Sequence, residues 1–354
     1  MTGRTTVSGA AAGTPVEKRA VDALLSLSGR TLPLLRQWVG SDPGCGVARA
    51  LLSLATGDRW DDALLKEQLV MAHRDALAVG EREASLVYGV FLHTHRQYRL
   101  TADHLVGHFV RWPADELAGL MLGAFSSCGD AAYRAQGDAL MEQQAAVAGP
   151  ESWPWVSWLA STRAEQGRVR EAHGLAGQAL ALHPRSGVAV HALAHAEHEL
   201  GAGRTCTGFL DQWLQADPQA VQSRHLNWHA ALQSIACGDF PDARRRADTA
   251  LARTDVGMRA ATNWRLLLVG QTPAGRSDPD QVRYCSPHRA VWRRSSIPST
   301  WPWPWPWRAR PTTCTSWPAE PPLTNALTSV TPWPPWCRHW QKSPRAAPAR
   351  RWTC

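Results

Sequence analysis

A 34-residue period in the middle of the chain is the feature that most limits the folds available to this sequence. His191 and His195 lie four residues apart, and 34 residues later His225 and His229 repeat the same spacing. A four-residue step places two side chains on one face of a helix, one turn apart. A period of 34 residues is typical of stacked pairs of antiparallel helices. We therefore expect two equivalent helices, one repeat apart, that carry their histidines on the same side.

Glycines and prolines repeat with the same period. Gly167 and Pro184 are expected to end the two helices of one unit, and Gly201 and Pro218 occupy the equivalent places 34 residues later. Proline cannot continue a helix, so it separates one repeat from the next. Because a single helical hairpin cannot bury its apolar face, stacked hairpins share a core and form a curved solenoid with a concave side.

The composition divides the chain into three parts. Residues 1–15 are rich in Gly, Thr, Ala and Ser, which predicts a disordered N-terminus. Residues 16–275 are rich in helix-forming residues and hold no alternating strand pattern, which predicts an all-α repeat domain. Residues 276–354 form a tail rich in Trp, Pro and Arg. Three of the expected helices, each followed by a Gly or Pro within two residues, are Tyr98–Arg111, Ala114–Ser127 and Ala131–Val147.

The tail differs from the repeat domain in charge and in pattern. It holds ten of the 19 tryptophans and 12 Lys and Arg against 3 Asp and Glu, so the net charge of +8 belongs to the tail alone. Residues 301–307 alternate Trp and Pro, a pattern that excludes a helix or a central strand. Tryptophan is encoded by TGG and proline codons begin with CC, so the frame one base earlier reads Leu, Val or Met alternating with Ala.

We therefore favour an unstructured tail translated out of frame over a genuine Trp/Pro-rich recognition segment. The coding nucleotide sequence around codons 270–300 tests this interpretation. Early stop codons in the shifted frame, or the lack of a helical period there, would contradict it.

The remaining composition excludes several classes of partner and location. The repeat domain is close to neutral, so we expect no nucleic-acid partner. No apolar run approaches the roughly 18–20 residues of a membrane span, and the first 16 residues lack the apolar core of a signal peptide. We therefore expect a cytoplasmic protein without a membrane partner. In such a reducing compartment four scattered cysteines are expected to be buried thiols: Cys45, Cys128, Cys206 and Cys237.

Three segments resemble the tetratricopeptide repeat protein 38 family. Val190–His195 reads V-H-A-L-A-H, and His225–Leu232 reads H-L-N-W-H-A-A-L, similar to two histidine-bearing helices of that family. Gly238–Ala243 looks like the family's G-x-[YF]-x-x-A helix break, and Leu226 departs from the family pattern, which usually has Asn there. The resemblance covers residues 17–275 and implies a helical-repeat fold. It implies no established reaction or ligand.

The four histidines allow three interpretations. Neutral imidazoles at this spacing are good ligands for zinc or another transition metal, although the protease motif H-E-x-x-H is absent. The rings can instead form a buried polar network with each other and with Asn227, and the pattern alone favours this interpretation. In the third, the histidines and Trp228 frame a pocket for a small ligand or a peptide terminus.

Two hypotheses about function follow. The first is a protein-binding scaffold that holds a protein or peptide partner on its concave face and needs no cofactor. The second is a metal-dependent or small-ligand-dependent protein, an enzyme included, that uses His191, His195, His225 and His229. The sequence assigns no catalytic residue, because a P-loop, a dinucleotide fingerprint and a nucleophile elbow are all absent. The basic run Arg244–Arg246 is interpreted as a solvated helix face, and the oligomeric state is not indicated.

Overall fold

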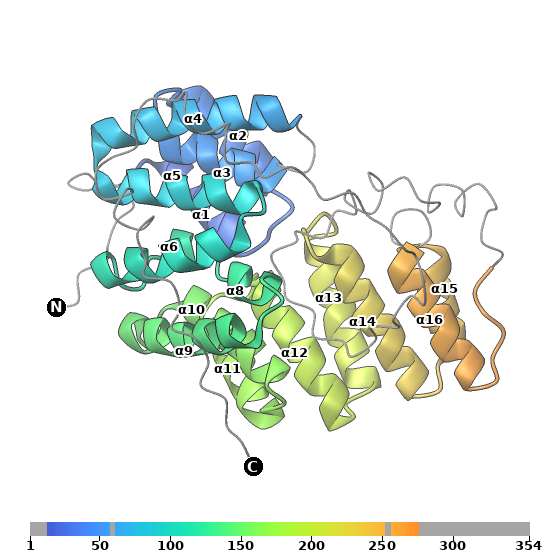
Figure 1. Ribbon diagram of the computed structural model, residues 1–354. Coiled ribbons are helices and arrows are strands. Elements are labelled where there is room, and N and C mark those ends of the chain that lie inside the picture. Colours follow the sequence, from blue (N-terminus) through green and yellow to red (C-terminus); the bar gives the residue numbers. More distant parts are fainter. Residues whose placement is uncertain (1–12, 57–60, 252–255, 276–354) are drawn as a thin grey trace, which may run out of the picture. The chain divides into compact units, whose positions relative to one another are not determined.

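Helices form all the regular secondary structure in the part of the chain that the computed structural model describes, which is residues 13–56, 61–251 and 256–275 (Figure 1). The helices of the first half are α1 (Pro15–Leu25), α2 (Thr31–Ser41), α3 (Gly46–Thr56), α4 (Asp62–Val79), α5 (Glu81–Thr94), α6 (Tyr98–Arg111), α7 (Glu116–Gly119), α8 (Gly123–Ser127) and α9 (Ala131–Ala148). Those of the second half are α10 (Trp153–Glu165), α11 (Val169–Leu182), α12 (Gly187–Leu200), α13 (Arg204–Ala216), α14 (Ser223–Ala236), α15 (Phe240–Asp248) and α16 (Val256–Leu268).

The second half has the packing of a helical-repeat superhelix. Each helix from α10 to α16 packs against the next along the chain, and contacts between alternate helices join α10 to α12, α12 to α14 and α14 to α16. These alternate helices form one layer, and α11, α13 and α15 form the other (Figure 1). Gly201 and Gly238 end α12 and α14 with positive φ, the conformation that glycine adopts without strain. The predicted all-α helical-repeat fold is confirmed.

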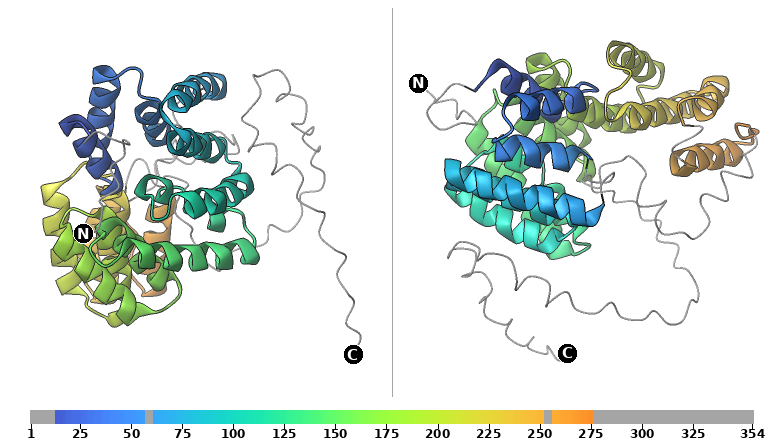
Figure 2. Two further views of the ribbon diagram at one scale, coloured as in Figure 1. Left: turned by 90° about the vertical axis from the view of Figure 1, so that its left-hand side faces the viewer. Right: turned by 90° about the horizontal axis from the view of Figure 1, so that it is seen from above.

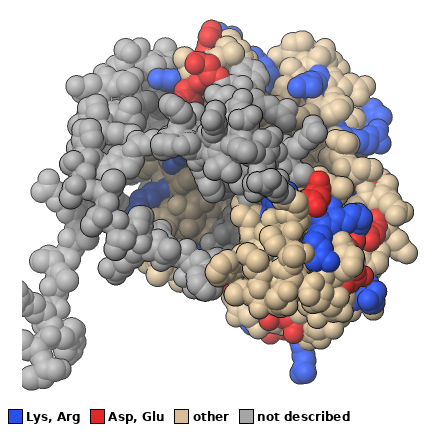
Figure 3. All heavy atoms as spheres, turned by 90° about the vertical axis from the view of Figure 1, so that its right-hand side faces the viewer, with Lys and Arg blue, Asp and Glu red and all other residues tan. Residues whose placement is uncertain are grey.

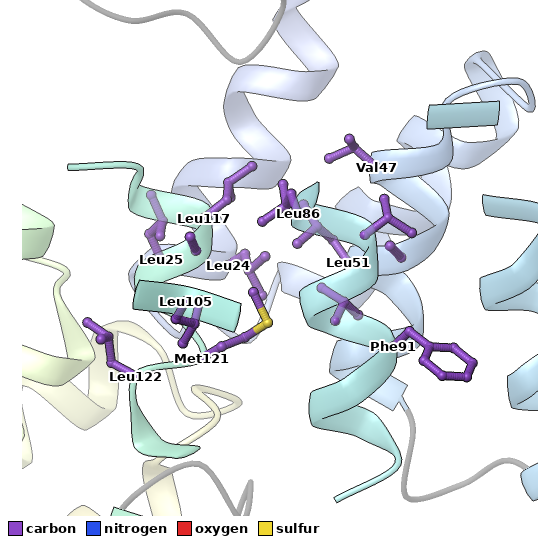
Figure 4. Packing of buried hydrophobic residues seen from close by; sticks show 14 of the residues in the cluster. Leu24, Leu25, Val47, Leu51, Leu86, Phe91, Leu105, Leu117, Met121 and Leu122 are labelled. Carbon is purple, nitrogen blue, oxygen red and sulfur yellow. The ribbon is translucent and has the colours of Figure 1, made fainter. Parts of the chain in front are cut away.

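Leucines and other large apolar side chains build the core of the first half. Leu51 on α3, Leu86 on α5 and Leu105 on α6 are all buried, and Figure 4 shows them with Met121 from the segment after α7. Burying a leucine side chain stabilises a fold by roughly 1.5–3 kcal/mol. These residues come from helices that follow one another in the chain. In each helix the apolar residues recur with the helical period, so this period predicts both the helix and its buried face.

The folded chain begins earlier than the composition indicates. Thr14 caps α1: its hydroxyl accepts a hydrogen bond from the backbone N–H of Glu17, and the Glu17 carboxylate accepts one from the N–H of Thr14. The expectation of disorder up to residue 15 is therefore wrong for its last residues. The expectations for residues 1–12 and for the tail, residues 276–354, lie outside the described part of the chain.

The segment expected to form one helix, Ala114–Ser127, is divided into α7 and α8. The hydrogen bonds between them are of the tighter i to i+3 kind, from the N–H of Met121 to the carbonyl of Ala118 and from Leu122 to Gly119. Gly119 allows this turn to pack against α10, because a Cβ at residue 119 would overlap the ring of Trp158. The break therefore depends on a contact with α10, which helix propensity alone does not indicate.

The loop between α1 and α2 binds to much later parts of the chain. The Ser26 carbonyl accepts a hydrogen bond of 2.9 Å from the N–H of Gly187, and the Leu27 carbonyl accepts one of 2.9 Å from Val221. Asp217 accepts hydrogen bonds of 3.0 Å from the Ser28 hydroxyl and from the Gly29 N–H. Figure 2 shows the dark blue N-terminal helices next to the yellow-green helices. These contacts join the first helical pair to the loops that begin α12 and α14.

Acidic and basic side chains are interspersed on the face drawn in Figure 3. Among the described residues, the search for a helix of sufficient length and apolarity to cross a membrane finds none.

Changing Gly46 to Ala is expected to destabilise the fold by at least about 1–3 kcal/mol, the usual effect of overpacking a core. A Cβ at Gly46 would overlap the carbonyl oxygen of Ala72 and lie 2.8 Å from the backbone nitrogen of Ala76, both on α4. The matched control is Gly40→Ala on α2, where a Cβ meets nothing within 4 Å and alanine favours the helix. Chemical denaturation of both variants checks this, and equal stabilities would contradict the close packing of α3 on α4.

Candidate functional site

Four histidine rings converge between α12 and α14. His191 and His195 lie one turn apart on α12, and His225 and His229 lie one turn apart on α14. The Nε2 atom of His191 is 2.9 Å from that of His225 and 3.1 Å from that of His195, and the Nε2 atoms of His225 and His229 are 3.0 Å apart. One nitrogen from each ring lies within 4.8 Å of the other three. The sequence spacing therefore predicts correctly that the two pairs come together.

Hydrogen bonding alone accounts poorly for these distances. A neutral imidazole has one N–H donor and one lone-pair acceptor, so each Nε2 offers a single proton or a single lone pair. The Nε2 atoms of His191 and His225 each take part in two of the three contacts. At most two of the three contacts can therefore be full hydrogen bonds, and the third brings two nitrogens together with no proton shared between them.

A single cation would satisfy all four lone pairs at once. Zinc binds imidazole nitrogen at about 2.0–2.1 Å in tetrahedral sites, so its ligand nitrogens are about 3.3 Å apart. The observed separations of 2.9–3.1 Å differ from that value by a few tenths of an ångström. Small movements of the rings suffice to bring these three contacts to the separation of a tetrahedral site.

The protonation of the rings suits a cation. Burial, with a smaller contribution from a neighbouring histidine in each case, lowers the pKa of His195 to about 4 and that of His225 to about 3. Burial and the other rings of the cluster hold the pKa values of His191 and His229 well below the ordinary value of 6.5. All four rings are therefore neutral at pH 7, which is the form that binds metals.

The ligand set contains nitrogen only. Glu197 is the acidic residue of α12 closest in sequence to His195. Its carboxylate accepts a hydrogen bond of 2.7 Å from Nε2 of His173, which is not part of the cluster. The exposed Glu199 is the other acidic residue of this helix. Imidazole ligands suit zinc, copper, iron and nickel, whereas magnesium and calcium prefer oxygen. The donor set thus favours a transition metal.

Asn227 takes part in a different network. Its Oδ1 accepts a hydrogen bond of 3.2 Å from Nη1 of Arg246, whose guanidinium also binds Asp242 at 2.6 Å and Asp211 at 2.8 Å. Arg246 is only 2% exposed, so the prediction that Arg244–Arg246 forms a solvated face is wrong for this residue. The network joins α13, α14 and α15, and its position gives Asn227 a structural role.

Trp228 packs on the side of α14 that faces α16. It is buried in an apolar cluster with Leu251 and Met258, and its ring contacts those of His225 and His229. The indole therefore shields the histidine cluster from solvent on this side.

The four cysteines differ in burial. Cys206 is buried, whereas Cys45, Cys128 and Cys237 are only half-buried, so the expectation of buried thiols is wrong for those three.

A pocket of about 870 Å³ lies elsewhere, and none of the predicted site residues lines it. Its walls include the α1–α2 loop, the end of α5, one face each of α9 and α10, and the segment that begins α14. Arg224 is the lining residue closest in sequence to the histidine cluster. The third interpretation, a ligand pocket framed by the histidines and Trp228, is therefore not supported by the position of this pocket.

A second buried histidine site was missed in the sequence. His108 Nε2 donates a hydrogen bond of 3.1 Å to Asp115, which leaves Nδ1 to accept one of 2.8 Å from the Ser85 hydroxyl. Burial alone would raise the pKa of Asp115, but the His108 hydrogen bond and the Arg82 charge together hold it below its ordinary value. The available signal was the four-residue spacing of His104 and His108 on α6, the same spacing as in the other pairs.

This Ser–His–Asp arrangement resembles a hydrolase relay, but its three side chains are buried and do not line the pocket. Arg82 also forms an ion pair of 2.9 Å with Asp115. Within the described residues, the arrangement serves to join α5, α6 and the start of α7.

No family model matches the chain, and no curated protein matches it with significant sequence similarity.

Proposed function

We propose that this chain is a helical-repeat protein that holds one transition-metal ion between α12 and α14. The observation that supports the proposal is the convergence of four Nε2 atoms with more close contacts than their protons can bridge. His191, His195, His225 and His229 would be the ligands, and zinc is the metal that best suits four neutral imidazoles in a tetrahedral arrangement. With Nε2 bound to the metal, each ring carries its proton on Nδ1.

The metal would serve to link two neighbouring repeats. Catalytic zinc sites usually keep one position open for water or substrate, whereas structural sites use four protein ligands. Four histidines fill the tetrahedral positions, so the proposal is a structural or regulatory ion rather than a catalytic one. A metal that binds the folded state alone stabilises it by about 2.7 kcal/mol at a concentration 100 times the dissociation constant.

Metal analysis of the purified protein tests the proposal. After equilibration with zinc and dialysis, we expect one equivalent of zinc in the wild-type protein and less than about a tenth of this in the double variant His195→Ala and His229→Ala. Removal of the metal with EDTA is expected to lower the melting temperature of the wild type by about 5–10 °C.

The matched control is His198→Ala, which removes an exposed histidine from the same helix. This variant should bind zinc like the wild type, and circular dichroism should show that both variants remain helical. Wild-type protein that binds no zinc, copper or nickel would contradict the proposal. Equal zinc content in the double variant would contradict the ligand assignment.

A second candidate function is the protein-binding scaffold with its partner on the concave face. The observation that favours it is the pocket of about 870 Å³ between the N-terminal helices and the later repeats. A cytoplasmic location and membership of the tetratricopeptide repeat protein 38 family belong to this proposal as well. The free thiols of the described cysteines are compatible with a reducing compartment.

A further inference from the structure

The pocket has the dimensions of a small-molecule site. Its volume of about 870 Å³ lies in the range of roughly 300–1,000 Å³ that is typical of such sites. One part of its wall, the α1–α2 loop, is held in place by hydrogen bonds to Gly187, Asp217 and Val221. This part of the wall is therefore held in position by the fold itself.

Two helices give the pocket a polar end and an apolar end. The lining residues of α9 are Arg134, Gly137, Asp138 and Met141, which share one helix face, and those of α10 are Trp158, Ser161, Thr162 and Glu165, which also share one face. The two helices are antiparallel, since Gln166 binds Asp138 and Arg163 binds Glu142.

Because the helices are antiparallel, Glu165 lies close to Asp138 and Arg134. Met141 and Trp158 lie toward the opposite end of the two helix faces that line the pocket. Further apolar lining comes from other helices and from the segment between α7 and α8: Leu24, Leu25, Leu54, Leu122 and Phe125.

Positive charge is in excess among the described residues that line the pocket. Arg96, Arg134 and Arg224 are the basic ones, and Asp138 and Glu165 are the acidic ones. Asp138 already accepts a hydrogen bond of 3.2 Å from Gln166. The exposed guanidinium of Arg134 acts on Glu165 through its charge, and no ion pair within 4.0 Å joins it to another described residue, so it can also approach an anion.

We propose that this pocket binds a small amphipathic carboxylic acid, with its apolar chain between Met141 and Trp158 and its carboxylate at Arg134. This small-molecule ligand goes beyond both candidate functions, because neither the metal site nor the protein-binding scaffold assigns a ligand of this class to the pocket. It does not depend on the metal proposal, because none of the four histidines lines the pocket.

Glu165 adds a pH dependence that a purely apolar pocket would lack. Glu165 lies at the solvent-exposed end of α10, where partial desolvation raises its pKa to about 7, with Arg134 opposing the shift and Asp138 adding to it. Neutral Glu165 can donate a hydrogen bond to a ligand carboxylate, whereas ionised Glu165 repels it. The other titratable and charged residues of the described lining are His93, whose pKa is lowered by burial to about 4, and the two arginines Arg96 and Arg224. Binding is therefore expected to weaken as the pH rises from 6 to 8.

Calorimetric titration of the full chain with three ten-carbon probes tests the proposal. We expect decanoate to bind with a stoichiometry of one and at least tenfold more tightly than decan-1-ol or decyltrimethylammonium. The variant Arg134→Gln should weaken decanoate binding about tenfold. The matched control Arg170→Gln, an exposed position outside the pocket, should leave it unchanged.

Glu165→Gln provides a second, independent readout. This variant keeps a neutral hydrogen-bond donor at all pH values, so decanoate should bind it with nearly the same affinity at pH 6 and pH 8, whereas the wild type should lose several-fold. Three results would each overturn the proposal: no binding of decanoate, equal binding of the cationic probe, or no effect of Arg134→Gln. Loss of zinc from the histidine cluster without loss of decanoate binding would leave it standing.

Discussion

Lowering the pH from 7 to 5 in the absence of metal is expected to remove most of the stability of the folded protein. The cause is the set of neutral histidines between α12 and α14, two buried and two half-buried, which accept protons far more readily in the unfolded chain. In the folded protein the pKa of His195 is about 4 and that of His225 is about 3, and the pKa values of His191 and His229 also lie well below 6.5.

The sign and size of the effect follow from proton linkage. A histidine whose pKa falls on folding contributes fully to stability above its unfolded pKa of about 6.5, and this contribution is lost as the pH falls from 6.5 towards the folded value. By pH 5 each such histidine destabilises the fold by about 2 kcal/mol relative to pH 7. Four of them approach the whole stability of a typical protein, which is about 5–15 kcal/mol. Three further histidines with a pKa lowered to about 4 act in the same direction: the buried His73 and His93 and the half-buried His104.

Urea denaturation at pH 7, 6 and 5 with EDTA present measures this effect. The variant His225→Gln should lose about 2 kcal/mol less stability than the wild type between pH 7 and pH 5, because one titrating group is gone. His198→Gln, at an exposed position on α12, should follow the wild type. A free energy of unfolding that stays constant between pH 7 and pH 5 would mean that the cluster is not buried as described.

Replacing Arg246 by Ala is expected to destabilise the fold by about 3–5 kcal/mol, the usual effect of removing one partner of a buried ion pair. The Arg246 guanidinium is 2% exposed and binds Asp211, Asp242 and Asn227 at 2.6–3.2 Å. Without it, Asp242 would keep a partly buried charge with fewer partners, and α13, α14 and α15 would lose their common contact.

The neighbouring residue provides the control. Arg245 also binds Asp242, but its side chain is 58% exposed, so Arg245→Ala should change stability by less than about 1 kcal/mol. Equilibrium denaturation of the two variants compares them directly. Similar free energies of unfolding for the two variants would show that burial of Arg246 contributes little to the stability of these repeats.

The repeat architecture and the convergence of the four histidines could both be predicted from the sequence. Helices at Tyr98–Arg111 and near 131–148 follow from patterns of neighbouring residues, because a helix is held by bonds four residues apart. His191 and His225 meet because equivalent helices in stacked repeats present equivalent faces. Both results depend only on spacing along the chain.

Contacts between distant parts of the chain could not be predicted and are known only from the tertiary structure. The α1–α2 loop binds Gly187 and Val221, and this arrangement depends on how the stacked helices curve back over more than a hundred residues. The burial of Arg246 and the pairing of Ser85 with His108 likewise depend on which surfaces meet. The position of one distant segment against another depends on the small rotations between neighbouring helices, which accumulate along the stack. A period in the sequence does not specify these rotations. The pocket and its lining residues could therefore not be predicted from the sequence.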